Sequence, residues 1–138
     1  MSLKTCRDCK EERPFNFFWS AGIKKGKKYY RRVCKICYNT TKHSYKHKVK
    51  SWFEGYKQKL ECLKCGYSKK THESFNVKAL QFHHNDDNKE FAVSEGVCHG
   101  LSMKRIVKEI QKCQVLCARC HAEHHYEIWI WRGLNKRE

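Results

Sequence analysis

The chain has no long apolar run and few apolar residues from which to build a core. Of its 138 residues 40% are hydrophobic, and no stretch of about 18 apolar residues is present that could cross a membrane. A chain of this length forms one domain or two very small ones, which need staples in addition to a core. The first four residues, Met-Ser-Leu-Lys, carry no apolar leader, so we expect a reducing cytoplasm rather than secretion.

Acidic residues are scarce, and their scarcity is uneven along the chain. Lys and Arg number 30 against 14 Asp and Glu, which gives a formal net charge of +16. Residues 1–60 hold 17 basic and 4 acidic side chains, whereas residues 61–138 hold 13 and 10. Because lysine and arginine displace condensed counterions from phosphates, such a first half is typical of a nucleic-acid-binding surface. A merely solvated surface is the alternative; a membrane partner is disfavoured, since no amphipathic anchor accompanies the charge.

Cysteine, by contrast, is abundant and regularly spaced. Eight of the ten cysteines form the four Cys-x-x-Cys pairs Cys6/Cys9, Cys34/Cys37, Cys62/Cys65 and Cys117/Cys120. Two thiolates at this spacing reach one tetrahedral Zn²⁺ from a tight turn, and two pairs complete the site. Four pairs therefore predict two structural zinc ions, and they make a redox motif or a disulfide framework the poorer interpretation.

The two zinc sites are predicted to form from pairs in sequence order, with an interleaved arrangement as the alternative. Order pairing leaves 24 residues between the pairs of the first site and 51 between those of the second. The ligands are then Cys6, Cys9, Cys34 and Cys37 for the first zinc and Cys62, Cys65, Cys117 and Cys120 for the second. Cys98 and Cys113 are left over, and we expect both to be small buried apolar side chains.

The segment inside the first zinc site combines aromatic and basic residues. An aromatic run at 14–19 precedes a Gly- and Lys-rich turn at 22–28 and an aromatic, basic strand at 29–32. This order predicts an N-terminal zinc ribbon over residues 1–40 whose hairpin contacts the DNA backbone, with a solvated loop as the alternative. The residues expected to make these contacts are Lys24, Lys25, Lys27, Lys28, Arg31 and Arg32.

Residues 41–61 are predicted to form a basic amphipathic linker helix. Apolar side chains recur there at helical spacing, and lysines mostly occupy the other face. Lys46 and Lys50 on that basic face are candidate nucleic-acid contacts.

The second zinc site encloses a pair of adjacent histidines, His83 and His84. Residues 79–84 are predicted to form a strand, 85–89 a polar turn, and 90–94 the returning strand of a hairpin.

Two helices are predicted beyond this hairpin. Ser102 is expected to cap a helix whose apolar face begins at Met103. A last helix, from Ala118 to about Trp131, sets His121 and His125 one turn apart on the same face. Strand, cysteine pair and helix would then bring His121 near the histidine pair.

Residues 62–126 resemble the HNH endonucleases of the ββα-metal, or His-Me finger, superfamily, in particular the small phage-type members with a zinc frame. The matching residues are those of the second zinc site, Leu80-Gln81-Phe82-His83-His84 with Lys89, and Leu116-Cys117-Ala118-Arg119-Cys120-His121 with His125. The N-terminal pairs are similar to the extra zinc ribbon of phage endonucleases related to recombination endonuclease VII. The resemblance implies a small zinc-stabilised α+β protein with a nuclease domain over 62–133 and a tail at 134–138.

The resemblance also implies roles for four histidines. His84 is implied to be the general base and His83 a ligand of a catalytic divalent metal, with His121 first and His125 second completing that site. His83 stands where Asp is common, so Mg²⁺ or Mn²⁺ is the family's metal but transition metals suit the imidazole better. Lys112 stands where an Asn usually braces the active-site loop.

The implied activity is hydrolysis of DNA phosphodiester bonds with one metal ion, giving 5′-phosphate and 3′-hydroxyl ends, with Lys89 among the DNA contacts. Two alternatives from other classes are a non-catalytic zinc-ribbon protein that binds nucleic acid through its basic half and a protein-interaction scaffold. The sequence leaves open whether the enzyme nicks one strand or cuts both, and whether it is a monomer or a homodimer. The expected setting is the cytoplasm of a bacterial or phage-infected cell.

Overall fold

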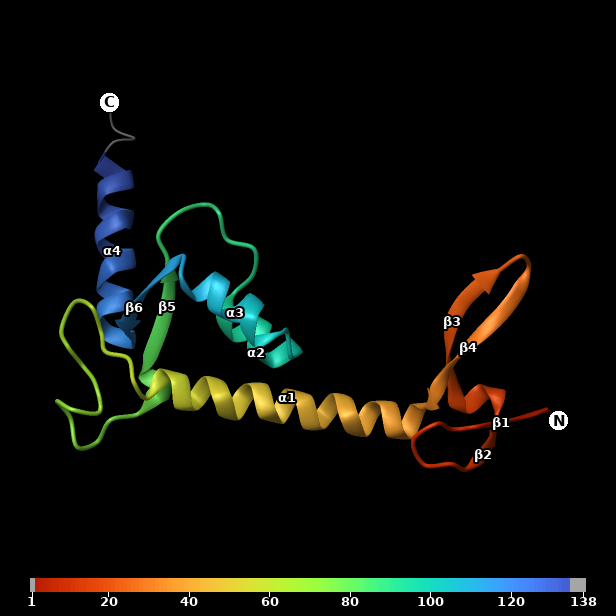
Figure 1. The fold of residues 1–138 in the computed structure, drawn as a ribbon. Coiled ribbons are helices and arrows are strands. Elements are labelled where there is room, and N and C mark those ends of the chain that lie inside the picture. Colours follow the sequence, from red (N-terminus) through yellow and green to blue (C-terminus); the bar gives the residue numbers. More distant parts are fainter. Residues whose placement is uncertain (1, 135–138) are drawn as a thin grey trace. The chain divides into compact units, whose positions relative to one another are not determined.

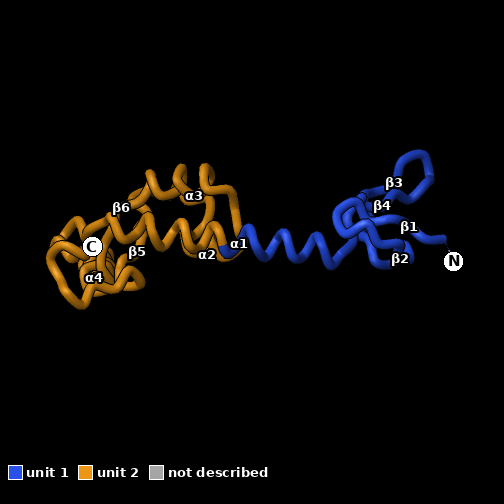
Figure 2. The backbone as a smooth tube through the Cα atoms, turned by 60° about the horizontal axis from the view of Figure 1, so that its bottom comes forward, with its two compact units in different colours: residues 1–47 blue, residues 48–138 orange. Residues whose placement is uncertain are grey.

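The chain forms two compact units that share one helix. The computed structural model describes residues 2–134, and its backbone divides into the two units after His47 (Figure 2). Helix α1 (Lys35–Lys57) begins in the first unit and ends in the second (Figure 1). The prediction of a small α+β fold with two four-cysteine clusters, β-hairpins and a long last helix is confirmed. Among the described residues, no helix is long and apolar enough to cross a membrane.

The first unit is built from two antiparallel strand pairs. The first pair is β1 (Leu3–Thr5) with β2 (Glu12–Pro14), and the second is β3 (Phe18–Lys24) with β4 (Lys27–Cys34). A 3-10 turn at Phe15–Phe17 lies between the pairs. The predicted Gly- and Lys-rich segment and basic strand lie in the second pair, whereas part of the aromatic run lies in the 3-10 turn before it.

The centre of the first unit is a cysteine cluster with very little apolar material around it. Its buried side chains, among the residues described, are Cys6, Phe18 and Cys34. The sulfur atoms of Cys6, Cys9, Cys34 and Cys37 all lie within 4.8 Å of one another, which confirms pairing in sequence order. Four sulfur atoms placed to hold one Zn²⁺ thus stand where a larger domain has its apolar core.

Helix α1 starts at Lys35, earlier than the linker helix that the sequence predicted over residues 41–61, and it ends at Lys57. Its first turn contains Cys37, a member of the first cluster. The helix extends to this cysteine because a ligand on its first turn ties the helix to the strands of the ribbon.

The second unit contains one two-stranded sheet and three helices after α1. Strand β5 (Leu80–His84) pairs antiparallel with β6 (Cys113–Cys117), with Leu80 opposite Cys117 and His84 opposite Cys113. The predicted returning strand over residues 90–94 is therefore wrong. Residues from Val93 to His99 form helix α2 instead.

A buried apolar cluster explains why this segment is helical. Val93 and Val97 lie one helical turn apart, and both are buried. In a strand, residues four apart would also share one face. As a helix, however, this segment packs both valines against buried apolar partners. Those partners are Val49 and Phe53 of α1 and Ile106 and Ile110 of α3 (Met103–Ile110).

The two predicted C-terminal helices are present. Ser102 caps α3, since its Oγ accepts a hydrogen bond from the Arg105 N–H at 3.3 Å. Helix α4 (Ala118–Leu134) follows β6 directly. Most of the predicted tail, residues 135–138, lies outside the described residues.

The second cysteine cluster joins the sheet to α4. The sulfur atoms of Cys62, Cys65, Cys117 and Cys120 all lie within 4.8 Å of one another, again in the predicted pairing. Leu80 and Leu116 of the sheet are buried against it.

The two left-over cysteines differ from each other. Cys113 is partly buried, whereas Cys98 is exposed, so the prediction that both are buried is wrong for Cys98. Cys98 lies on the solvent side of α2 because Val93 and Val97 occupy the buried side.

Backbone donors favour the ionised form of one cysteine in each cluster. Burial raises the pKa of Cys6 and Cys62, but backbone N–H groups, among them those of Cys34 and Cys117, lower both to about 6. The Cys34 N–H lies 3.3 Å from the Cys6 sulfur. In the same clusters, neighbouring thiols together with burial raise the pKa of Cys37 and of Cys120 to about 12, so it is the four-sulfur geometry that suits Zn²⁺.

Replacing Cys120 by Ser removes a buried sulfur of the second cluster. We expect zinc content to fall from two ions per chain to one and the second unit to lose its cooperative unfolding. Structural zinc contributes about 10–16 kcal/mol in zinc-finger peptides, as much as the whole stability of a small domain. Atomic emission measures the zinc, and circular dichroism follows unfolding.

Cys98→Ser is the matched control, since Cys98 is exposed and lies outside both clusters. This variant should keep two zinc ions and the unfolding temperature of the unmodified chain. A Cys120→Ser protein that retains both ions would contradict the assignment.

Candidate active site

Strand β5 ends in two adjacent histidines that meet different partners. Successive side chains of a strand point to opposite faces. His83 consequently faces the histidines of α4, and His84 faces α3. The predicted pair therefore belongs to two different arrangements of side chains.

His83 forms a cluster with the two predicted histidines of α4. One ring nitrogen from each of His83, His121 and His125 lies within 4.8 Å of the other two. The closest approach is 3.3 Å, between His83 Nδ1 and His121 Nε2. His121 and His125 come from successive turns of α4, and their ring centroids are 4.6 Å apart. This arrangement can hold a metal ion.

The electrostatics of the cluster favour neutral imidazoles. Burial lowers the pKa of His83 and of His121, and the neighbouring histidines lower both further. A neutral imidazole is the form that binds a metal. Three nitrogen donors suit first-row transition metals, whereas Mg²⁺ prefers oxygen ligands.

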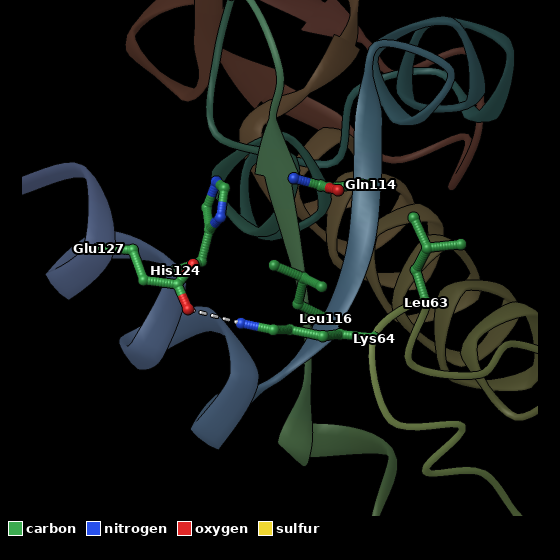
Figure 3. A pocket seen from close by; sticks show the side chains of 6 residues that line it. All are labelled: Leu63, Lys64, Gln114, Leu116, His124 and Glu127. Carbon is green, nitrogen blue, oxygen red and sulfur yellow. Dashed lines mark hydrogen bonds and ion pairs between the residues drawn. The ribbon is translucent and has the colours of Figure 1, made fainter. Parts of the chain in front are cut away.

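A fourth histidine, His124, adjoins this cluster and was missed by the sequence analysis. Its ring centroid lies 4.6 Å from that of His83. It lines a cavity of about 290 Å³ whose other walls include Gln114 and the ion pair of Lys64 with Glu127, 3.0 Å between Nζ and Oε1 (Figure 3). Its position three residues after His121 was the signal in the sequence, because residues three apart share a helix face.

His84 contacts a buried carboxylate that the sequence analysis also missed. Its Nε2 lies 2.9 Å from Oε1 of Glu109, a residue of α3 that is only 1% exposed. The sequence did indicate its position, because Glu109 follows Ile106 by three residues and so lies on the apolar face of α3.

Glu109 is ionised because its partners outweigh its burial. Burial raises its pKa, but hydrogen bonds from Lys112, from the Glu90 backbone N–H and from His84 lower the pKa to about 2. The Lys112 Nζ lies 2.7 Å from Oε2, and the Glu90 nitrogen lies 2.9 Å from Oε1. An ionised carboxylate only accepts hydrogen bonds, so Nε2 of His84 carries the proton and Nδ1 is left as the basic nitrogen.

Lys112 holds the loop that follows β5. Its ammonium donates to the Asn88 carbonyl oxygen at 3.1 Å and to Glu90 Oε1 at 3.1 Å, in addition to Glu109. Its own carbonyl accepts from the Asn85 N–H at 3.3 Å. The lysine at the position where the resembled family usually has Asn thus ties this loop to the end of α3.

His84 and His121 line the same cavity, which has a volume of about 350 Å³. Three lysines, Lys57, Lys78 and Lys89, also line it, and none of its lining residues is acidic. Burial lowers the pKa of Lys57. A cavity with this charge suits an anionic group such as a phosphate.

The predicted nucleic-acid contacts are distributed over several elements. Lys89 lines the cavity beside His84, and Lys50 is exposed on α1, where Lys46 is half-buried. The other predicted contacts are exposed on β3, β4 and the turn between them; they are Lys24, Lys25, Lys27, Lys28, Arg31 and Arg32.

No protein-family model matches the chain, and no match was found among curated proteins or solved structures. A functional assignment consequently rests on the geometry of this site.

Glu109→Gln keeps the shape of the side chain but removes its charge. We expect a loss of about 1–3 kcal/mol in the free energy of unfolding at neutral pH, since His84 and Lys112 lose a charged partner in a buried place. The pKa of Glu109 is depressed, so its contribution is full above about pH 4.5 and is lost as the pH falls towards 2. Urea unfolding in zinc-containing buffer measures both effects.

Glu73→Gln removes the same charge from an exposed position and should change the free energy of unfolding by less than about 0.5 kcal/mol. Equal effects of the two variants at neutral pH would show that Glu109 contributes no special interaction.

Proposed function

We propose that this protein is a metal-dependent DNA endonuclease of the HNH kind, which hydrolyses phosphodiester bonds with His84 as general base. The observation that carries the proposal is the division between the adjacent histidines of β5. His83 joins an imidazole triad, His84 is oriented by a buried carboxylate, and His84 and His121 border one basic cavity. A core histidine pair would need neither arrangement.

His84 is suited to take a proton from the attacking water. With Nε2 held by Glu109 at 2.9 Å, its Nδ1 is the free acceptor. The carboxylate also stabilises the imidazolium that forms when the proton arrives. Glu109 therefore acts as a positioning residue for His84 and does not itself contact the substrate.

His83, His121 and His125 would hold the catalytic metal ion. When bound there, a divalent ion supplies Lewis acidity at the phosphate and stabilises charge that develops in the transition state. The all-nitrogen donor set favours first-row transition metals over Mg²⁺, and Mn²⁺ is the one among them that the resembled family uses.

The lysines of the cavity would orient the scissile phosphate. Lys57, Lys78 and Lys89 line the cavity on three different segments of the chain, so they can neutralise a phosphate beside His84. Water attack in line with the 3′ oxygen then leaves a 5′-phosphate and a 3′-hydroxyl end. The three lysines would bind the substrate and take no part in proton transfer.

His84→Ala removes the proposed base. We expect cleavage of supercoiled plasmid with Mn²⁺ to fall about a hundredfold to ten-thousandfold, the usual contribution of general-base catalysis, with zinc content and DNA affinity retained. His99→Ala is the control, because His99 is exposed on α2 and does not line the cavity.

Undiminished cleavage by the His84→Ala protein would remove His84 from the mechanism. Gel retardation of the plasmid by the unmodified protein, without nicking under any divalent metal, would favour the non-catalytic nucleic-acid-binding alternative. The basic charge of residues 1–60 is the observation behind that alternative.

His125→Ala deletes one nitrogen donor of the triad. The concentration of Mn²⁺ that gives half-maximal cleavage should rise by at least about tenfold, since even partners outside the ligand shell contribute this much to metal affinity. His124→Ala is the matched control: it removes an imidazole from the same helix and the same surroundings, but from outside the triad. Equal shifts in the two variants would contradict the assigned ligand set.

A further inference from the structure

The ribbon formed by β3 and β4 extends beyond what the first zinc site needs. At its base Phe18 and Cys34 are buried beside the cysteine cluster. From Trp19 to Tyr29 every side chain is exposed, on both faces of the ribbon. An isolated two-stranded hairpin is at best marginally stable, and this one gains no burial to compensate. Its length therefore calls for a role other than packing.

The turn of the ribbon holds a lysine in an unfavourable conformation. Lys25 and Gly26 both have positive φ, 49° and 74°, as a two-residue type I′ turn requires. Asn, Asp and Gly are the residues preferred at the first of these positions, and other side chains are strained there by about 1–2 kcal/mol. The ribbon thus carries a positive charge at its tip against the preference of its own backbone.

The charges along the ribbon repel one another. Lys24 lies directly opposite Lys27, and like charges at such a pair destabilise a sheet. Within residues 2–134, no ion pair involves a lysine of the ribbon. The sequence has no acidic residue between Glu12 and Glu54. The lysines of the ribbon therefore stay available to bind an anion of another molecule.

Beside the turn, the pairing register places an exposed apolar or aromatic side chain on each face of the ribbon, in addition to the exposed Trp19 nearer its base. Tyr29 pairs with Gly22 and lies on the face of Lys24 and Lys27, while Ile23 lies on the other face, opposite Lys28. No atom lies within 4 Å of the position that a Cβ on Gly22 would occupy, so the surface beside Tyr29 is open. A ribbon bare on both faces can be enclosed by the two walls of a groove.

We propose that the β3–β4 ribbon enters the major groove of B-form duplex DNA with its two faces against the walls of the groove and with Lys25 and its neighbouring lysines on the phosphates. The major groove of B-form DNA is about 12 Å wide and admits a two-stranded ribbon, whereas that of A-form RNA is too narrow. The choice of DNA as ligand rests on the proposed function. The ribbon deepens it by naming the form of DNA that the first unit binds.

The test uses the full chain with His84→Ala and no added divalent metal, so that binding is measured without cleavage. Fluorescence anisotropy compares a labelled DNA duplex of about 20 base pairs with the RNA duplex and the single DNA strand of the same sequence. We expect the DNA duplex to bind at least about tenfold more tightly than either at the same salt concentration. Equal or tighter binding of the RNA duplex or of the single strand would overturn the groove assignment.

Lys25→Asn in this background separates folding from binding. Asn suits the left-handed turn, so the thermal unfolding temperature should stay unchanged or rise. Affinity for the duplex should fall about tenfold at 50 mM salt, and the slope of log K against log salt should decrease by about 0.9, as for the loss of one phosphate contact. Lys27→Gln, which relieves the Lys24–Lys27 repulsion, should likewise weaken binding without lowering stability.

Lys10→Asn is the matched control. Lys10 is exposed and has a φ of 64°, but it lies next to the Cys6/Cys9 pair and not on the ribbon. Its substitution therefore removes the same charge from the same backbone conformation. Its affinity should equal that of the background protein. Equal losses for Lys10→Asn and Lys25→Asn would overturn the inference. A chain that binds as expected but cleaves no DNA would leave the ribbon assignment standing and refute only the proposed nuclease activity.

Discussion

The candidate site depends on the second cysteine cluster, whose four sulfur atoms are placed to hold one metal ion. Cys117 ends β6 and Cys120 lies in the first turn of α4, so one ion fixes the direction in which the helix leaves the strand. His121 follows Cys120 directly, and Leu80, opposite Cys117, starts the strand that ends in the histidine pair. The few apolar side chains around this cluster could not hold strand and helix at a fixed angle alone. A metal ion held by the four sulfur atoms would replace that missing core and would fix the geometry of the triad.

The buried carboxylate of Glu109 imposes a second constraint. An unpaired buried charge is costly, and Glu109 avoids that cost by binding His84, Lys112 and the backbone of the loop after β5 at once. Removal of any one of these partners would leave buried charge with fewer hydrogen bonds to compensate it. The loop after β5, the end of α3 and His84 consequently form one electrostatic unit. This unit fixes the tautomer of His84 without any contact from the histidine triad.

Local patterns in the sequence predicted most of the elements but not their long-range pairing. The cysteine spacing gave both clusters, the cap at Ser102 gave α3, and the i, i+4 spacing of His121 and His125 gave two of the triad's donors. The polar turn after His84 suggested a local hairpin, yet β5 pairs with distant β6, since burying Val93 and Val97 on a helix outweighs a short returning strand. Glu109 was missed because a charged residue on a helix is normally assigned to solvent, and its burial is visible only once its partners are in place.

The two units divide affinity and chemistry between them in the proposed function. The second unit, residues 48–138, holds 17 basic and 11 acidic side chains, and the cavity beside His84 presents three lysines. Few phosphate contacts give weak, weakly salt-dependent binding. The first unit, residues 1–47, holds 13 basic and 3 acidic side chains but none of the triad and neither His84 nor Glu109. Tight binding of DNA by the cleaving unit itself would slow the release of product. In the proposed function, the basic ribbon would keep the protein on the duplex. The site beside His84 could then bind each phosphate loosely and release it after cleavage.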